Sequence, residues 1–309
     1  MLKTRSTDAV LILVALVWGS SYLAAKTATA ALPVTAVLFG RYAISALACV
    51  AVVALRRPAR RWTRAEIQVG SLLGVTQAAV LVLETYGVAH TSAANAGLII
   101  SLTIVLTPLL DRTGSRRLPL RFFLAAGLCV LAVALLTSGT GLHTLRLGDI
   151  LMLAAAMVRA GHVALVGRLT TASMEPLHLT SMQTVVGSML CLALAAPYLP
   201  ELAHASAVSW AELTYLALLC SVFAFLAQTW AVQKTSASRA SLLLGSEPIW
   251  AVVIGIGLGG EHLTTLAILG AVLMLTGTYW GQAIERAHRT ALTTTKYAEP
   301  SPVPTPASI

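Results

Sequence analysis

The sequence predicts an all-α integral membrane protein with ten transmembrane helices, arranged as an inverted structural repeat of five helices plus five. Three observations favour this class. The composition is 57% hydrophobic and only 11% charged, whereas an average soluble protein carries about 25% charged residues. Apolar segments of about 20 residues, the length that an α-helix needs to cross a bilayer, follow one another along the chain. The two halves of the chain also resemble each other.

The predicted spans are separated by short polar breaks. They are residues 9–27, 33–55, 67–89, 92–110, 119–138, 149–169, 176–197, 210–232, 237–258 and 263–283. Glycine and alanine are frequent in them, as in Gly70-x-x-x-Gly74, and small residues let helices pack closely in lipid. The alternating segments of about ten residues that a membrane β-barrel needs are absent. We therefore expect a helical bundle.

Basic residues gather on one side of the predicted membrane. The net charge is +9, and if the spans alternate from a cytoplasmic N-terminus, 17 of the 21 Lys and Arg residues fall in cytoplasmic segments or at the cytoplasmic ends of spans. Such an excess marks the cytoplasmic loops of membrane proteins. We predict a multi-pass protein of the inner or plasma membrane with both termini cytoplasmic. The Arg-rich stretch 56–64 is then a topology signal, and we expect no nucleic-acid partner.

The internal repeat is clearest where residues 85–103 align with residues 229–247 without a gap. At this shift of 144 residues, seven positions are identical and Tyr86 faces Trp230. Other shifts pair Asp8 with Asp149 and Trp18 with Arg159. Each half holds five spans, and since five is odd, the second copy must enter the membrane from the opposite side.

The predicted organisation follows from the spans and the repeat. Residues 1–8 form a cytoplasmic N-terminus, residues 9–138 the first repeat, and residues 149–283 the second repeat. Residues 287–309 are polar and rich in proline towards their end, so we predict a disordered cytoplasmic tail.

Several motifs resemble the EamA-type permeases of the drug/metabolite transporter superfamily. In the second half these are Lys234-Thr235-Ser236-Ala237, Arg239-Ala240, Glu247-Pro248 and Gly259-Gly260-Glu261 with Gly270. In the first half they are LVWGSSYLAAK (16–26), FGRYAISAL (39–47) and VAHTSAANAGLIISLT (88–103). The resemblance spans residues 8–284. It implies ten helices in an inverted repeat, a central cavity, and movement of small metabolites without ATP hydrolysis.

The chain departs from the family pattern at three positions. Ile104 stands where the family usually has proline, and Pro108 follows one turn later. Arg117 stands where an acidic residue is common, and Arg159 replaces an aromatic residue of the sixth span. The charge of the solute is therefore left open.

Arg159 and His162 stand three residues apart in the sixth span and share one helix face. A cation within a span must face a cavity or a partner rather than lipid. Arg159 either pairs with a carboxylate, Glu84 or Glu247, or binds an anionic group of the solute. His162 either packs in the bundle or lines the cavity.

Glu84 is the carboxylate of the third span, seven residues after Gln77 and thus on the same face. It is a candidate for carrying a proton or a cation, or it pairs with Arg41 or Arg159 for assembly. We expect the first, third, sixth and eighth spans to form the cavity, and the fourth and ninth to close its ends. The predicted solute-binding residues are Trp18, Gln77, Glu84, Arg159, His162, Gln228 and Trp230. The two tryptophans either wall the cavity or pack.

Four residues are predicted to have gating or structural roles. Arg41 matches an arginine that is common at this place in the family, and we favour an ion pair for it over solute contact. Pro108 and Pro248 interrupt helical hydrogen bonding. Pro248 would free a carbonyl near Leu244 in mid-helix, and Glu247 would lie at the cavity edge or pair with a basic group.

The sequence contains no motif for metal binding, nucleotide binding or catalysis. Cys49, Cys129, Cys191 and Cys220 all lie within spans, and we interpret them as small apolar residues in helix interfaces. The sequence has no metal-ligand spacing, no phosphate-binding loop and no nucleophile motif. We therefore expect no metal, no cofactor and no enzyme activity.

The prediction for function is a secondary transporter, an exporter or exchanger of a small polar or amphipathic metabolite that works by alternating access. The alternative is a polytopic membrane enzyme or lipid-modifying protein with an intramembrane site. The predicted partners are the solute, the lipid bilayer and protons as a candidate coupling ion. Gly277 and Gly281 lie on one face of the tenth span, which either packs within the chain or forms a homodimer.

Overall fold

The computed structural model describes residues 2–56, 61–110, 119–137, 146–171, 173–234, 244–262 and 264–298. All regular structure in these ranges is helical. In the part of the chain described, eight helices are long and apolar enough to cross a membrane, and two shorter apolar helices span Leu120–Leu136 and Glu247–Gly257. The predicted all-α membrane class is confirmed. The exact number of ten spans stays a prediction, because the ninth, 237–258, begins in residues outside the described ranges.

The described part of the first half forms six helices. They are α1 (Leu2–Ala31), α2 (Val34–Leu55), α3 (Arg64–Ala89), α4 (Ala93–Ile100), α5 (Thr103–Leu110) and α6 (Leu120–Thr137). The fourth predicted span is thus two helices with a turn between them. At that turn the Ser101 hydroxyl donates to the Leu98 carbonyl at 2.6 Å, and a side chain that bonds its own backbone competes with the helix. Pro108 lies within α5.

The second half contains α7 (Leu147–Leu169), α8 (Pro176–Ala195), the 3₁₀ turn η1 (Ala196–Tyr198), α9 (Leu199–Ala203) and α10 (Ala207–Ala217). A π-helical segment, η2 (Leu218–Phe223), joins α10 to α11 (Ala224–Lys234). The last helices are α13 (Glu247–Gly257) and α14 (Thr265–Ala298). The eighth predicted span therefore runs from α10 through η2 into α11.

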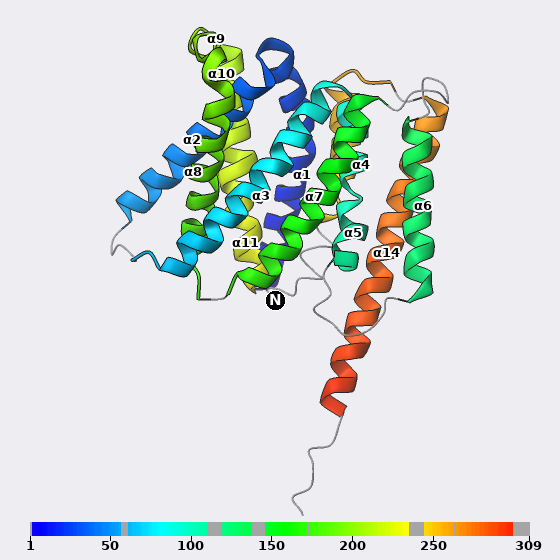
Figure 1. Cartoon of the computed structure of the whole chain (residues 1–309). Helices are drawn as coiled ribbons and strands as arrows, with labels where there is room; N and C mark the ends of the chain where they lie inside the picture. The colour runs from blue at the N-terminus through cyan, green and yellow to red at the C-terminus, as the bar shows by residue number, and fades with distance from the viewer. Residues whose placement is uncertain are drawn as a thin grey trace, which may run out of the picture.

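The C-terminal prediction needs a correction. Residues 287–298, which we assigned to a disordered tail, continue α14 as a helix that extends beyond the bundle (Figure 1). The segment from Ala287 to Ala298 contains neither glycine nor proline, and the first helix-breaking residue after it is Pro300. The prediction of disorder for residues 299–309 falls outside the described ranges.

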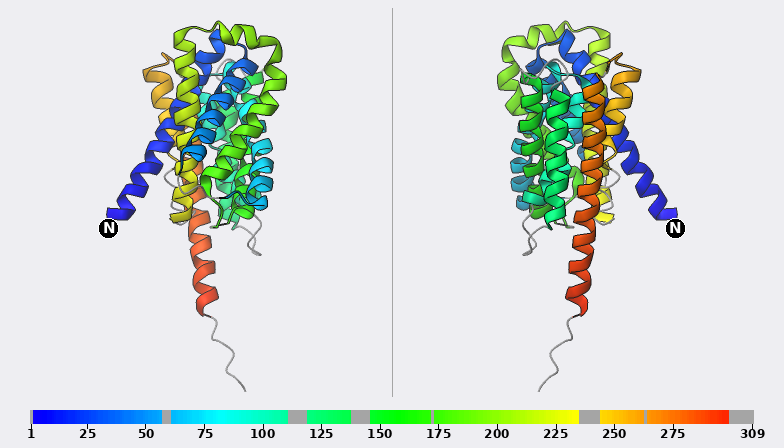
Figure 2. Two further views of the ribbon diagram at one scale, coloured as in Figure 1. Left: turned by 90° about the vertical axis from the view of Figure 1, so that its left-hand side faces the viewer. Right: turned by 90° about the vertical axis from the view of Figure 1, so that its right-hand side faces the viewer.

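Helices from the two halves interleave in one bundle (Figures 1 and 2). From the first half, α3 packs against α7 and α8, α2 packs against α8, and α1 packs against α13. The N-terminus and the end of α14 lie at one end of the bundle, whereas α9 lies at the other (Figure 1). The end of α2 and the start of α3 lie on the side of the bundle that holds the N-terminus, as the predicted alternation of spans requires (Figure 1).

Glycines permit several of these close contacts. A Cβ atom on Gly70 would lie 2.6 Å from Cβ of Met182, and one on Gly74 would lie 2.9 Å from Cβ of Val186. The Gly70/Gly74 face of α3 therefore packs directly on α8. A Cβ on Gly277 would lie 2.7 Å from Sγ of Cys129, so this face of α14 is covered by α6 of the same chain.

A buried carboxylate joins the two halves at the N-terminal end of the bundle. Glu66 is fully buried and forms a capping box with Thr63 at the start of α3. Its Oε1 accepts the Glu175 N–H at 2.8 Å, and its Oε2 lies 3.2 Å from Nδ1 of His178, which stacks on Trp62. The start of α3 is thereby fixed to the start of α8.

A second carboxylate joins the halves at the opposite end. Glu261 follows α13, and its two oxygens accept the backbone N–H groups of Ala93 at 2.6 Å and Ala94 at 2.9 Å. The first N–H groups of a helix have no partner within the helix, so Glu261 caps α4. Lys26 of α1 pairs with the same carboxylate at 3.0 Å.

Candidate functional site

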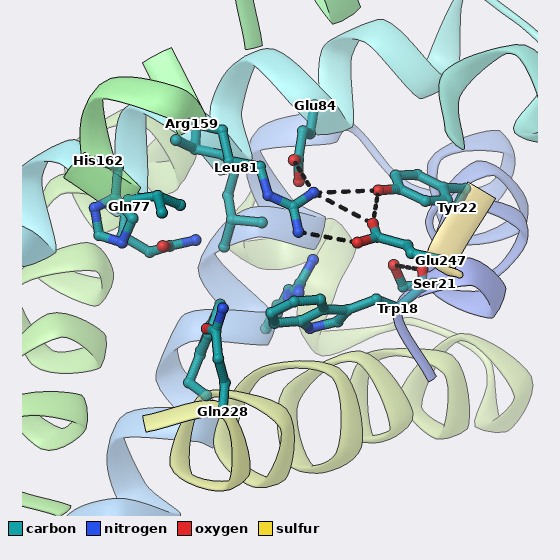
Figure 3. A pocket seen from close by; sticks show the side chains of 14 residues that line it. Trp18, Ser21, Tyr22, Gln77, Leu81, Glu84, Arg159, His162, Gln228 and Glu247 are labelled. Atoms are coloured by element: carbon teal, nitrogen blue, oxygen red, sulfur yellow. Dashed lines mark hydrogen bonds and ion pairs between the residues drawn. The ribbon is translucent and has the colours of Figure 1, made fainter. Parts of the chain in front are cut away.

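An ion-pair cluster lies in the interior of the bundle, centred on Arg159 of α7. Arg159 Nη2 lies 3.2 Å from Oε2 of Glu247, and Nη1 lies 3.3 Å from Oε1 of the same carboxylate (Figure 3). Arg159 Nη1 also lies 3.4 Å from Oε1 of Glu84 on α3. The two carboxylates that the sequence offered as partners of Arg159 thus both contact it. The Arg159–Glu247 contact has the two-pronged geometry that suits a guanidinium and a carboxylate.

Two aromatic side chains of α1 complete the cluster. The Trp18 ring centroid lies 5.1 Å from Cζ of Arg159, within range of a cation–π contact. The Tyr22 hydroxyl donates to Glu247 Oε1 and accepts from Arg159 Nη1 at 3.4 Å. Tyr22 is not among the residues predicted from the sequence. Its position one turn after Trp18, on the same helix face, is the signal that would have found it.

The π-helical segment η2 provides an acceptor for Trp18. The N–H of Ala224 bonds to the carbonyls of Leu219 and Ser221, so the Cys220 carbonyl lacks the N–H that an α-helix would supply. The Trp18 indole Nε1 donates to this carbonyl at 3.0 Å. Single π-helical turns often occur at functional sites, and here the turn orients the indole that faces Arg159.

Arg41 of α2 is held by the same segment. Its Nε donates to the Ser221 hydroxyl at 2.8 Å, and Ser221 in turn donates to the Leu216 carbonyl. We predicted an ion pair for Arg41. Among the residues that the structure describes, its hydrogen-bond partner is a hydroxyl instead, because η2 turns Ser221 towards α2.

These side chains surround a small pocket, which we call the Arg159 pocket. It is lined from α1, α2, α3, α7, α11 and α13. The four spans predicted to form the cavity all contribute, and α2 and α13 add to them. Its charged and polar lining residues are Ser21, Arg41, Gln77, Glu84, Arg159, His162, Gln228 and Glu247. All the predicted solute-binding residues except Trp230 line the pocket.

Several candidates have other surroundings. His162 Nδ1 lies 2.7 Å from the Thr76 hydroxyl, which fixes its ring at the pocket edge. Trp230 does not line the pocket and packs against Leu11. Pro248 stands in the first turn of α13, not in mid-helix as we predicted. A proline is tolerated there, because the N–H that it lacks would have no partner within the helix.

The Arg159 pocket encloses only about 50 Å³. A cavity needs about 10–15 Å³ to hold one water molecule, whereas pockets for small organic ligands enclose about 300–1,000 Å³. The arrangement therefore has room for a few water molecules. A metabolite could enter only if the side chains of the cluster or the helices that carry them moved apart.

Within the described ranges, no group of three or more His, Cys, Asp or Glu side chains is placed to hold a metal ion. The four cysteines are all buried and unpaired. They lie in helix interfaces, and Cys129 contacts the glycine face of α14. The polar side chains in the described interior thus form ion pairs and hydrogen bonds between helices.

Comparisons with known proteins agree with this architecture. An uncharacterized transporter of Archaeoglobus fulgidus is 26% identical over 277 residues, which cover 88% of this chain and 84% of the relative. A solved structure, described only as the crystal structure of a protein, superposes with a TM-score of 0.62 over 92% of this chain and 98% of its own. That protein is 16% identical, so the likeness supports the fold alone.

The sequence profile described as the EamA-like transporter family matches residues 5–138 and again residues 146–280. The two matches cover nearly all of both predicted repeats, including every helix that lines the Arg159 pocket. The chain belongs to the EamA-like transporter family and is a multi-pass membrane transporter.

Proposed function

We propose that the protein is a secondary transporter that exports or exchanges a small polar or amphipathic metabolite by alternating access, with the Arg159 pocket as its solute site. The observation that carries this proposal is a charged pocket in the interior of an otherwise apolar bundle. Ionisable groups inside membrane helices are costly, and they typically mark a pathway or a binding site. Helices of both repeats line this pocket.

The repeat supports the choice of this pocket. Trp18 and Arg159 occupy matching positions of the two repeats, and so do Glu84 and Gln228. All four residues line the pocket, and the guanidinium of Arg159 faces the ring of Trp18. In transporters with inverted repeats, the solute site lies where the repeats meet. A site at this junction changes its access when one repeat moves against the other.

The proposal is tested by metabolite profiling of cells that express the wild-type gene, no gene, or the Gln77→Ala, Gln228→Ala double variant. We expect one or a few small metabolites to appear in the medium only with the wild-type gene. The Glu201→Gln variant is the matched control, because Glu201 is exposed in α9, away from the pocket. A chemically altered product in place of a displaced metabolite would favour the alternative of a membrane enzyme.

We further propose that both termini are cytoplasmic and that the protein resides in the plasma membrane, on the strength of the basic residues. A reporter active only outside the cytoplasm should give a signal when fused after Pro200, which lies in α9. Fused after Arg61, just before α3, it should give none. The reverse pattern would contradict both the orientation and the inverted repeat.

Single cysteines test the pocket in a background from which the four native cysteines are removed. We expect Gln77→Cys and Gln228→Cys to react with a small water-soluble thiol reagent, because alternating access must wet both positions. Val130→Cys on α6 is the control, since Val130 is 66% exposed on the apolar outer surface of the bundle. Equal inertness of all three cysteines would show that no water reaches the pocket.

A further inference from the structure

The two carboxylates of the Arg159 pocket are held to different degrees. Both oxygens of Glu247 contact Arg159, and Oε1 also accepts the hydroxyl hydrogen of Tyr22. Glu247 is the first residue of α13, where the helix dipole further stabilises a negative charge. Glu84 makes one ion pair among the described residues, at 3.4 Å from Arg159. Glu247 is therefore fixed by several interactions, and Glu84 by a single long one.

Both Nη atoms of Arg159 already contact carboxylates. Both of its Nη atoms face Glu247, and the Trp18 ring lies against the guanidinium. An anionic solute that took the place of either carboxylate at Arg159 would leave that carboxylate buried without its cation, which is strongly unfavourable. A cationic solute needs only to replace the single contact of Glu84. Afterwards each of the two carboxylates still faces a cation.

The charges around the pocket also favour a cationic solute as the partner of Glu84. Glu84 and Glu247 share one guanidinium, that of Arg159. Arg41 also lines the pocket and attracts Glu84 from a longer distance, but its described hydrogen bond is to Ser221, and no ion pair within 4.0 Å joins it to Glu84 in the described ranges. A cation at Glu84 would give this carboxylate a partner of its own and leave the Arg159–Glu247 pair intact.

We propose that Glu84 is the solute-binding carboxylate and that it takes the protonated amine of a small organic cation. Arg159 and Glu247 form the structural pair beside it. The side chains of Val80 and Leu81, on the same helix as Glu84, also line the pocket. They offer apolar contact to a short carbon chain attached to the amine. This inference rests on the proposed function, because it uses the same pocket.

The test measures melting temperatures of the purified protein in detergent, with propylammonium chloride or sodium propionate added at a constant ionic strength set by sodium chloride. We expect propylammonium to raise the melting temperature of the wild type with saturation, and propionate to leave it unchanged. Glu84→Gln should weaken the apparent affinity for propylammonium at least tenfold. The Glu201→Gln control removes an exposed carboxylate and should bind as the wild type does.

Glu84→Asp keeps the charge with a shorter reach and guards against misfolding of the Gln variant. It should still prefer propylammonium to propionate. Stabilisation by propionate, or equal affinity for propylammonium in wild type and Glu84→Gln, would overturn the inference. If propylammonium does not bind while cells still export a metabolite, the inference fails and the proposed function stands. If it binds and no metabolite crosses, the proposed function fails.

Discussion

Arg159→Leu should lower the free energy of unfolding by about 3–5 kcal/mol, because it leaves two buried carboxylates without their cation. Arg159 is the residue that joins Glu84 of α3 to Glu247 of α13, so its loss affects both repeats. Thermal and chemical unfolding of detergent-purified protein measures the effect. Arg159→Lys should be intermediate, because it keeps the charge but cannot contact both oxygens of Glu247 in parallel.

Second changes test the cause of this loss. Glu247→Gln in the Arg159→Leu background should restore much of the stability, since it removes the charge that Arg159 neutralises most directly. Glu84→Gln should restore less, because Glu84 makes one contact to Arg159 and Glu247 makes two. Wild-type stability of Arg159→Leu, together with a complete loss of export, would contradict the structural role. Arg159 would then bind the solute itself.

Most of this cluster could be predicted from the sequence, because ionisable residues stand out in apolar spans. Arg159 and Glu84 are ionisable residues in apolar spans, so they could be recognised without knowing the fold. Their separation of 75 positions gives no hint of contact, and only the bundle places α7 against α3. Tyr22 escaped notice because tyrosine is common in membrane helices and its hydroxyl becomes informative only when its partner is known.

The helix interruptions could not be predicted in the same way. An apolar segment has the same composition whether the helix within it is continuous or broken. The turn at Ser101 and the π-helical segment η2 depend on hydrogen bonds that the local sequence permits but does not require. The indole of Trp18 donates to the Cys220 carbonyl, which does not receive the Ala224 N–H in η2, and Trp18 lies 202 residues away in the sequence. Such helix interruptions therefore depend on contacts with distant residues, which the local sequence does not show.

Thr91 is a residue whose counterpart in the other repeat could be predicted from the sequence, whereas its contact in the structure could not. The repeat alignment identified it as one of the identical positions, and Asp149 as the partner of Asp8 in the other repeat. In the structure the Thr91 hydroxyl donates to Asp149 Oδ1 at 2.6 Å, which joins the end of α3 to the start of α7. The repeat thus matched both residues with counterparts in the other half, but it could not show that they contact each other.

Gly97→Ala should destabilise the protein by about 1–3 kcal/mol, the usual cost of overpacking a core. A Cβ atom at Gly97 of α4 would lie 2.1 Å from Cβ of Ala251 on α13, and 3.3 Å from the ring of Tyr22. The added methyl group must therefore push α13 away from α4. Because α13 carries Glu247, we also expect the variant to export less metabolite than the wild type.

The Gly127→Ala variant is the matched control, because a Cβ at Gly127 of α6 would meet no atom within 4 Å. It gains the same helix propensity as Gly97→Ala, about 1 kcal/mol, without a clash. Ala251→Gly removes the methyl group that Gly97→Ala would strike, so the double variant should be more stable than the two single effects predict by addition. Simple additivity in this cycle would mean that α4 and α13 do not touch at these residues. The contact between α4 and α13, which holds Glu247 at the Arg159 pocket, would then be disproved.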